Sequence, residues 1–200
     1  MKLSQISLII AGVFSIIIGL VSFRFLVLDI NLAFPNFGEH ITKRNLTLIA
    51  HISAAPIALI IGAIQLLPKK RAKRPALHRW LGRVYGFAIL IGGISGLMLA
   101  INALGGIVAG LGFGILAILW MGTTMQAIRM AMMQNFNQHR KWMIRSFALT
   151  FAAVTLRLYL LGFTLAGFGY IEATFYIAWL CWLPNIIFAE WWIKRTARSS

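Results

Sequence analysis

The sequence predicts an all-α membrane protein, a polytopic bundle of six transmembrane helices with both termini in the cytoplasm. Hydrophobic residues make up 60% of the 200-residue chain, whereas soluble domains contain about 45–50%. Apolar runs of about 20 residues recur, which is the length of helix that crosses ~30 Å of hydrocarbon. The 19 Lys and Arg residues far outnumber the 4 Asp and Glu residues, and most of them fall between alternate runs.

Short polar connections that contain proline or glycine separate the predicted spans, among them "PNFGEH", "PKKRAKRPALHR" and "NALGG". The spans cover residues 5–28, 46–67, 79–102, 106–129, 142–166 and 171–193. The first run is longer than the core of a signal peptide and no small-residue cleavage motif follows it, so we expect it to remain as a span. We expect residues 1–200 to form a single integral membrane domain.

The positions of the basic residues predict the orientation, because Lys and Arg are retained on the cytoplasmic side. With the N-terminus inside, the cytoplasmic cations are Lys2, the cluster at 69–83, Arg129, Arg140, Lys141, Arg145, Lys194, Arg195 and Arg198. The cations that fall elsewhere are Arg24, Lys43, Arg44 and Arg157. A net charge of +15 would also suit a nucleic-acid binder. No polar stretch is long enough to form a soluble nucleic-acid-binding domain, so the lipid bilayer is the expected partner.

A short motif occurs twice, as "HRWLGRVY" at 78–85 and "HRKWMIRSF" at 139–147. Each copy places a histidine, an arginine and a tryptophan at the cytoplasmic start of a span. Arginine and tryptophan are common at membrane interfaces but histidine is not, so the repeat suggests two helices that present equivalent groups at one depth. Neighbouring cations and the positive helix N-terminus both disfavour a protonated imidazole. We therefore expect His78 and His139 to be neutral.

Three interpretations of this histidine pair stay open. Two neutral imidazoles could ligate the iron of one haem b, with nearby arginines holding the propionates. Those arginines are Arg79, Arg83, Arg140 and Arg145. The same cations could instead bind an anionic lipid headgroup, a quinone or a small anion. In the third interpretation the histidines bond to backbone carbonyls in a structural accessory subunit. No common soluble catalytic motif occurs, so enzymatic activity is left open.

The fifth span has a polar or small face that begins at His139. Ser146, Thr150 and Arg157 return to that face at helical spacing. A polar stripe is costly against lipid, so we expect it to face the interior of the bundle rather than to have Arg157 extend outward. His51, which enters the second span from its outer end, begins a similar stripe.

Two polar residues of the last span also stand out. Asn185 follows Pro184, whose ring removes a backbone hydrogen bond, so the Asn185 amide is expected to satisfy the carbonyl left free. Glu190 is the carboxylate expected near the cytoplasmic arginines, and an ion pair with Arg145, Arg140 or Arg83 is its predicted role.

Four segments carry a family resemblance: "ALHRWLGRVYGFAILIGGISGL", "LWMGTTMQA", "HRKWMIRSFALTFAAVTLRLYL" and "CWLPNIIFAEWW". Together they resemble the bacterial family of predicted membrane proteins catalogued as domain of unknown function 2306, over about residues 45–195. The resemblance implies a multi-pass protein of the bacterial inner membrane and assigns no activity.

A fainter resemblance is to the transmembrane ascorbate-dependent cytochrome b proteins. It rests on "LHRWLG" at the start of a span, on six spans and on histidines at helix ends. Those proteins hold two haems through two histidine pairs, and by position His78 and His139 would form the cytoplasmic pair. His51 has no histidine partner on the fourth span, so the resemblance supports one haem at most.

Overall fold

The computed structural model describes residues 5–65 and 74–197, and its regular structure in those ranges is entirely helical. Six segments are long and apolar enough to cross a membrane, which confirms the predicted class. They are Ser7–Leu26, Asn45–Gln65, Pro75–Ala100, Gly106–Met132, Phe136–Leu165 and Tyr170–Thr196. Part of the predicted basic cluster at 69–83, residues 69–73, lies outside the described residues.

The chain divides into two compact units, Met1–Ser95 and Gly96–Ser200, with the boundary inside helix α6 (Pro75–Ala100). The expectation of a single membrane domain stays a prediction.

In the first unit, α1 (Gln5–Ser22) packs against α4 (Asn45–Gln65). Gly19 permits the close approach, since a Cβ atom at that position would lie 2.5 Å from Cγ1 of Ile60. Ser15 and Ser22 face the interior and donate to carbonyls of their own helix. Helix packing through small residues and self-satisfied hydroxyls is typical of membrane helices.

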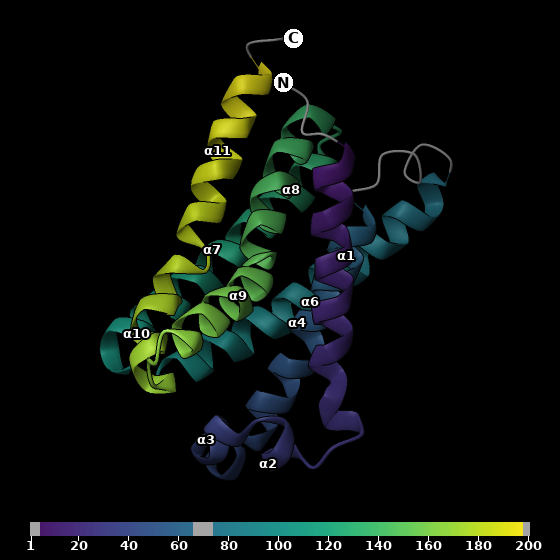
Figure 1. Ribbon diagram of the computed structural model, residues 1–200. Coiled ribbons are helices and arrows are strands. Elements are labelled where there is room, and N and C mark those ends of the chain that lie inside the picture. Colours follow the sequence, from purple (N-terminus) through teal and green to yellow (C-terminus); the bar gives the residue numbers. More distant parts are fainter. Residues whose placement is uncertain (1–4, 66–73, 198–200) are drawn as a thin grey trace. The chain divides into compact units, whose positions relative to one another are not determined.

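The connection after α1 is folded rather than irregular (Figure 1). It contains η1 (Phe23–Leu26), α2 (Ile30–Ala33), η2 (Pro35–Phe37) and α3 (Gly38–Lys43). Arg24 fixes it by donating from Nε and Nη2 to the Ala33 carbonyl, at 2.9 and 2.6 Å, and by stacking 4.4 Å from the centre of the Phe34 ring. The Asp29 carboxylate caps α2 by accepting from the backbone N–H of Asn31, which lowers the pKa of Asp29.

The second unit contains α7 (Gly106–Met132), α8 (Phe136–Thr150), α9 (Ala152–Leu165), α10 (Tyr170–Leu180) and α11 (Leu183–Ala197). Helices α7 and α8 form an antiparallel hairpin with extensive contact. Helix α10 packs closely on α7 at Gly112, where a Cβ atom would lie 2.8 Å from the Ala178 carbonyl oxygen. Trp179 adds a hydrogen bond of 3.1 Å from Nε1 to the carbonyl of Val108.

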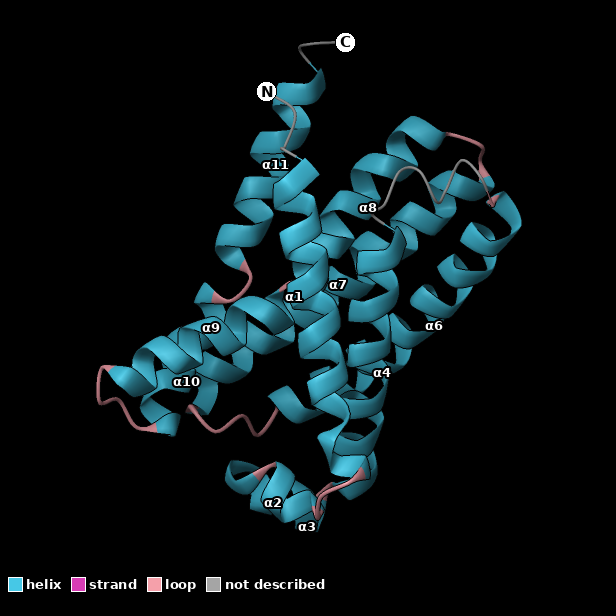
Figure 2. Ribbon diagram, turned by 45° about the vertical axis from the view of Figure 1, so that its right-hand side comes forward, coloured by secondary structure: helices cyan, strands magenta, loops and turns pink. Residues whose placement is uncertain are grey.

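The last two spans, expected over 142–166 and 171–193, each contain two helices in succession. The fifth span is interrupted at Phe151, and the sixth at Cys181 and Trp182. Figure 2 shows the second interruption as a loop between α10 and α11. The halves pair with each other, α9 with α10 and α8 with α11. Pro184, the second residue of α11, accounts for the second interruption because it cannot donate to the preceding turn.

The interruptions are joined by hydrogen bonds. The Cys181 carbonyl accepts from Thr155 Oγ1 at 2.5 Å and from Asn185 Nδ2 at 2.9 Å. Asn185 Nδ2 also lies 3.3 Å from the Ala148 carbonyl and 3.1 Å from Thr155 Oγ1. Asn185 thus donates to a backbone carbonyl, as predicted, but that carbonyl belongs to Cys181 and not to Leu180, the residue four positions before Pro184. Since no water is available within the hydrocarbon, the Thr155 and Asn185 side chains donate the hydrogen bonds that a continuous helix would supply from its backbone N–H groups.

Replacing Asn185 by leucine is expected to lower the free energy of unfolding by about 1 kcal/mol, because its backbone acceptors lose a donor in an apolar medium. Reversible unfolding by denaturing detergent in bicelles measures the change. Asn137→Leu, at an exposed position of α8, is the matched control and should alter stability by less than about 0.5 kcal/mol. Equal effects of the two substitutions would contradict the role given to Asn185.

Candidate functional site

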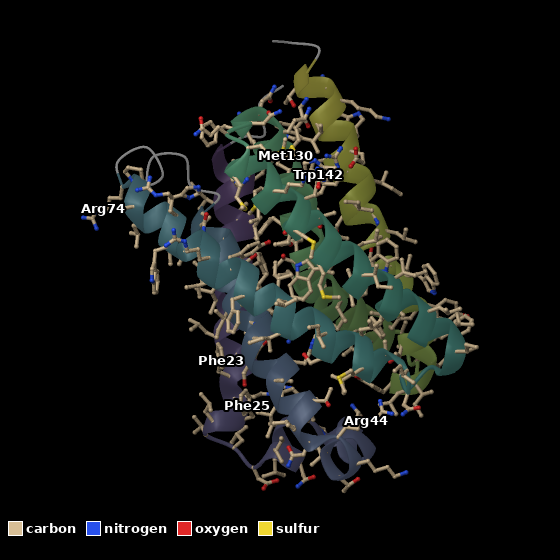
Figure 3. The ribbon with its side chains drawn as sticks, turned by 180° about the vertical axis from the view of Figure 1, so that it is seen from behind. Phe23, Phe25, Arg44, Arg74, Met130 and Trp142 are labelled. Carbon is tan, nitrogen blue, oxygen red and sulfur yellow. The ribbon has the colours of Figure 1, made fainter. Side chains whose placement is uncertain are left out.

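The α7–α8 turn determines where His139 lies. Gln134 adopts a left-handed backbone conformation with φ of 58°, and Asn135 then caps α8 by accepting from the backbone N–H of Gln138 at 3.1 Å. The backbone N–H of His139 donates to the Asn135 carbonyl at 2.9 Å. His139 is thus held in the first turn of α8. Figure 3 shows Met130 of α7 and Trp142 of α8 at this end of the second unit.

The His139 ring is oriented by a backbone carbonyl of α7. Its Nδ1 atom lies 2.8 Å from the carbonyl oxygen of Ala127, a residue that is fully buried. A carbonyl can only accept, so Nδ1 carries a proton, and in the neutral ring that the sequence predicts Nε2 then presents a lone pair. Among the described residues, Nε2 has no hydrogen-bond partner. This contact fits a structural histidine, and it is also the contact that metal-ligating histidines make through their second nitrogen.

Ser146 and Thr150 face the interior of the second unit, as the polar stripe predicts. Ser146 is 0% exposed and Thr150 is 3% exposed. The Ser146 hydroxyl lies 2.7 Å from that of Thr124 on α7, and Trp120 Nε1 donates to Thr150 Oγ1 at 2.8 Å. Thr124 and Thr150 also donate to carbonyls of their own helices. These hydroxyls are satisfied within the protein and form a polar seam between α7 and α8.

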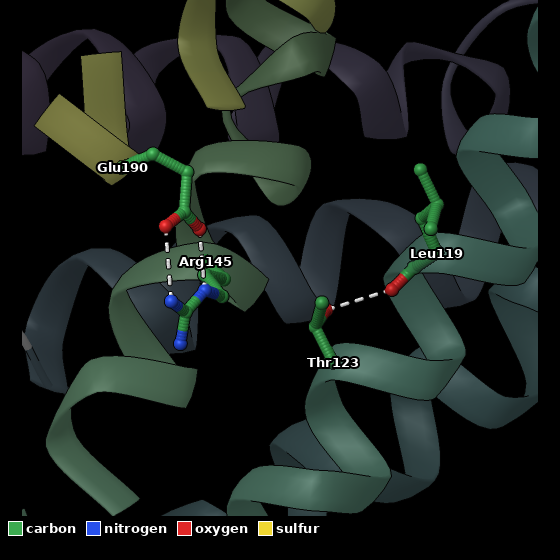
Figure 4. Close-up of polar contacts among 4 residues, drawn as sticks. All are labelled: Leu119, Thr123, Arg145 and Glu190. Carbon is green, nitrogen blue, oxygen red and sulfur yellow. Dashed lines mark hydrogen bonds and ion pairs between the residues drawn. The ribbon is translucent and has the colours of Figure 1, made fainter. Parts of the chain in front are cut away.

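Arg157 does not continue that face in a single helix. The interruption at Phe151 separates it from Ser146 and Thr150, and Arg157 Nη1 donates to the Ala153 carbonyl of its own helix at 2.7 Å. Thr123, beside the seam, likewise donates to the Leu119 carbonyl of its own helix at 2.8 Å (Figure 4). The contacts of Ser146 and Thr150 agree with the predicted polar face, and the continuation of that face to Arg157 stays a prediction.

Arg145 and Glu190 form the ion pair that the sequence predicts as one of three options. Nε of Arg145 lies 2.5 Å from Oε1 of Glu190, and Nη2 lies 3.0 Å from Oε2 (Figure 4). The guanidinium also lies over the Trp142 ring, 4.4 Å from its centre. The side chains are 19% and 38% exposed, respectively, so the pair is partly shielded from solvent. The charge of Arg145 is already balanced, which weakens its expected role in binding a propionate.

Other cations of the second unit remain exposed near this end. Arg129, close to the end of α7, and Arg140, next to His139, are both exposed. Neither forms an ion pair within the described part of the chain. These side chains are therefore available to an anionic group.

The remaining expected site residues belong to the first unit. His78 is half-buried in the first turn of α6, where its backbone N–H donates to the Arg74 carbonyl, and Arg79 and Arg83 are exposed. His51 in α4 places Nδ1 2.8 Å from the carbonyl oxygen of Gly92 on α6. His51 thus uses the same ring nitrogen as His139 to contact a backbone carbonyl on another helix.

Several partners in the second unit were not predicted from the sequence. Trp120, Thr124 and Ala127 on α7 contact the predicted residues of α8, and Thr155 contacts Asn185. Trp120 could have been found, because a tryptophan in the middle of a span needs an acceptor for its indole N–H. Ala127 carries no such signal, since its contribution is a backbone carbonyl. Among residues 5–65 and 74–197, no three His, Cys, Asp or Glu residues gather as a candidate metal site.

Comparison with known protein families found one family model that matches most of the chain. The model of a family described as a predicted membrane protein, DUF2306, matches residues 48–193. The chain belongs to this family. The match confirms the resemblance over about residues 45–195 and crosses both compact units, so the family segment includes His51, His78 and His139. No curated protein and no solved structure matches the chain. The similarity to cytochrome b proteins stays a prediction.

The Arg145–Glu190 pair is expected to contribute about 1 kcal/mol of coupling energy, above the median for exposed pairs because it is bidentate and partly buried. A double-mutant cycle with Arg145→Gln and Glu190→Gln, followed by reversible unfolding in bicelles, measures it. Raising the salt concentration should reduce the coupling only modestly. Arg129→Gln is the control for removing an exposed cation, and a coupling indistinguishable from zero would contradict this assignment.

Proposed function

We propose that this protein is an electron carrier of the bacterial inner membrane that holds one haem b through His139 and His78. The observation that carries the proposal is the hydrogen bond between His139 Nδ1 and the Ala127 carbonyl. It supports a ring whose Nε2 lone pair is presented for ligation, as in metal sites where the second ring nitrogen donates to a carbonyl. The assignment of His78 as the second ligand rests on the repeated sequence motif.

The bound haem would supply one-electron transfer. The roles of this chain's own residues follow from their contacts and exposure. The Ala127 carbonyl sets the orientation of the His139 ring, and the exposed guanidinium of Arg140 offers a counter-charge for a propionate. Arg79 and Arg83 have the same role beside His78. Arg145 instead holds Glu190 and so joins α8, the helix that carries His139, to α11. Electrons would pass between a cytoplasmic donor and a membrane quinone or partner protein.

We also infer that both termini are cytoplasmic. The supporting observation is the gathering of exposed cations at the α7–α8 turn and at the start of α6, such as Arg129, Arg140 and Arg79.

The haem proposal predicts a Soret band in the absorption spectrum of protein purified after haem-supplemented expression. His139→Ala and His78→Ala should each remove or shift the band, because each removes an axial ligand. His40→Ala, in the outer helix α3, is the matched control and should leave the spectrum unchanged. Absence of the band would exclude the proposal, and a band that survives the double substitution would exclude the ligands.

A second candidate function is binding or transport of an anionic lipid headgroup or small anion. The observation in its favour is that Arg129 and Arg140 are exposed and form no ion pair within the described ranges. Together with the helix N-terminus at His139, they offer positive charge to an anion near the membrane surface. A structural accessory subunit without a ligand is the remaining hypothesis.

The anion hypothesis predicts that phosphatidylglycerol in nanodiscs raises the melting temperature relative to phosphatidylcholine, and that Arg140→Gln removes most of the increase. Free phosphate as a second titrant separates a small-anion site from a lipid site. The response should not depend on haem. If neither haem nor anionic ligands bind, and His139→Ala is tolerated, the accessory-subunit hypothesis is favoured.

A further inference from the structure

Gln65, the last residue of α4, has an unusual side chain. Its Nε2 atom is buried and has no hydrogen-bond partner in the part of the chain that the structure describes. An unsatisfied buried donor costs about 1–3 kcal/mol of stability, so such groups are rare and call for an explanation. One explanation is that the donor belongs to a binding site.

The amide of Gln65 lies against Gly82 on α6. A Cβ atom added at Gly82 would lie 3.7 Å from Gln65 Nε2, which is an ordinary contact distance. Gly82 is one helical turn beyond His78, and Tyr85, in the next turn, is only 1% exposed. The amide and the glycine are therefore neighbours on the side of α6 that carries His78. Both residues lie within the first unit, in which α4 and α6 are joined at their other ends by the His51 to Gly92 contact.

The surroundings of Nε2 limit what it could bind. An amide N–H needs an oxygen acceptor. Gln65 is the last residue of α4, and the residues that precede it in the helix are apolar, with Ile61, Gly62 and Ala63 buried. Bringing a charged acceptor to one neutral donor in such a place is costly. An anionic group would bind more favourably to the exposed guanidinium groups of Arg79 and Arg83. A neutral carbonyl oxygen is the acceptor that matches a neutral, buried donor.

We propose that Gln65 Nε2 donates a hydrogen bond to a neutral carbonyl oxygen of a membrane-dissolved ligand that lies against Gly82. Two molecules in the bilayer carry such an oxygen, the headgroup of a quinone and the acyl ester of a phospholipid. The quinone source deepens the proposed electron-transfer function and rests on it. The hydrogen bond itself does not, because neither Gln65 nor Gly82 belongs to the haem site.

The test uses isotope-edited infrared spectroscopy of the full-length protein in nanodiscs. In discs of ether-linked lipids, which have no ester carbonyl, decylubiquinone labelled with ¹³C at its carbonyls is titrated. The expected result is a carbonyl stretch at lower frequency than that of free quinone, together with saturable binding. Gln65→Leu should remove the shift and weaken binding about tenfold, as expected for loss of one hydrogen bond. Gln126→Leu, at a half-buried glutamine of α7, is the matched control and should change neither.

A second arm uses ester-linked lipids labelled at their ester carbonyls, without quinone. A shifted ester band that depends on Gln65 would identify a lipid as the ligand. Gly82→Ala provides an independent variant, because its methyl group fits without a clash and would lie in contact with the amide nitrogen, on the side where the ligand is proposed. It should lower the affinity even if Gln65→Leu fails to fold. The proposal is overturned if neither labelled carbonyl shows a shift that depends on Gln65. Running both arms on haem-free protein keeps this result separate from the haem proposal.

Discussion

The carbonyl oxygen of Cys181 marks the constraint on which much of the second unit depends. Inside a bilayer, every backbone polar group must find a partner within the protein. The fifth and sixth spans both interrupt their helices, and Thr155 and Asn185 supply donors to the Cys181 carbonyl where the spans meet. With these donors present, α9 can pair with α10 while α8 pairs with α11. The change of direction between the helix pairs is thus tolerated in an apolar medium because two side chains satisfy the backbone.

The polar seam between α7 and α8 links this architecture to the candidate site. Trp120 contacts Thr150, and Thr124 contacts Ser146, so four residues forward on α7 correspond to four residues backward on α8. Closer to the turn the register is no longer the same, because Ala127 lies three residues beyond Thr124 whereas His139 lies seven residues before Ser146. The seam holds α7 against α8, and the position of the imidazole is then set locally by the left-handed turn at Gln134 and by the Ala127 carbonyl.

The arginines of the second unit differ in burial and in whether an acidic side chain neutralises them. Glu190 neutralises Arg145 where the pair is partly buried, in keeping with the cost of leaving one charge unpaired in a poorly solvated place. Arg129 and Arg140 stay exposed, where solvent and headgroups can balance them. Of these neighbouring cations, Arg145 therefore has a structural role in an ion pair, whereas Arg129 and Arg140 are accessible to a ligand. Residue type and spacing could not make that distinction, because it depends on which helix approaches which.

The sequence by itself determined the membrane class, the six spans and the family segment, because hydrophobic length and long ordered motifs are local properties of the chain. It also identified Ser146, Thr150, Asn185 and Glu190 as residues that need partners. Only the tertiary structure identified the partners. Ser146 contacts Thr124 and Thr150 contacts Trp120, while Asn185 donates to the Cys181 carbonyl and Glu190 pairs with Arg145. The tertiary structure likewise divided the last two spans and left the Gln65 amide without a partner among the described residues. The physical reason is that apolar length is encoded along one segment, whereas hydrogen-bond satisfaction depends on segments that meet only after folding.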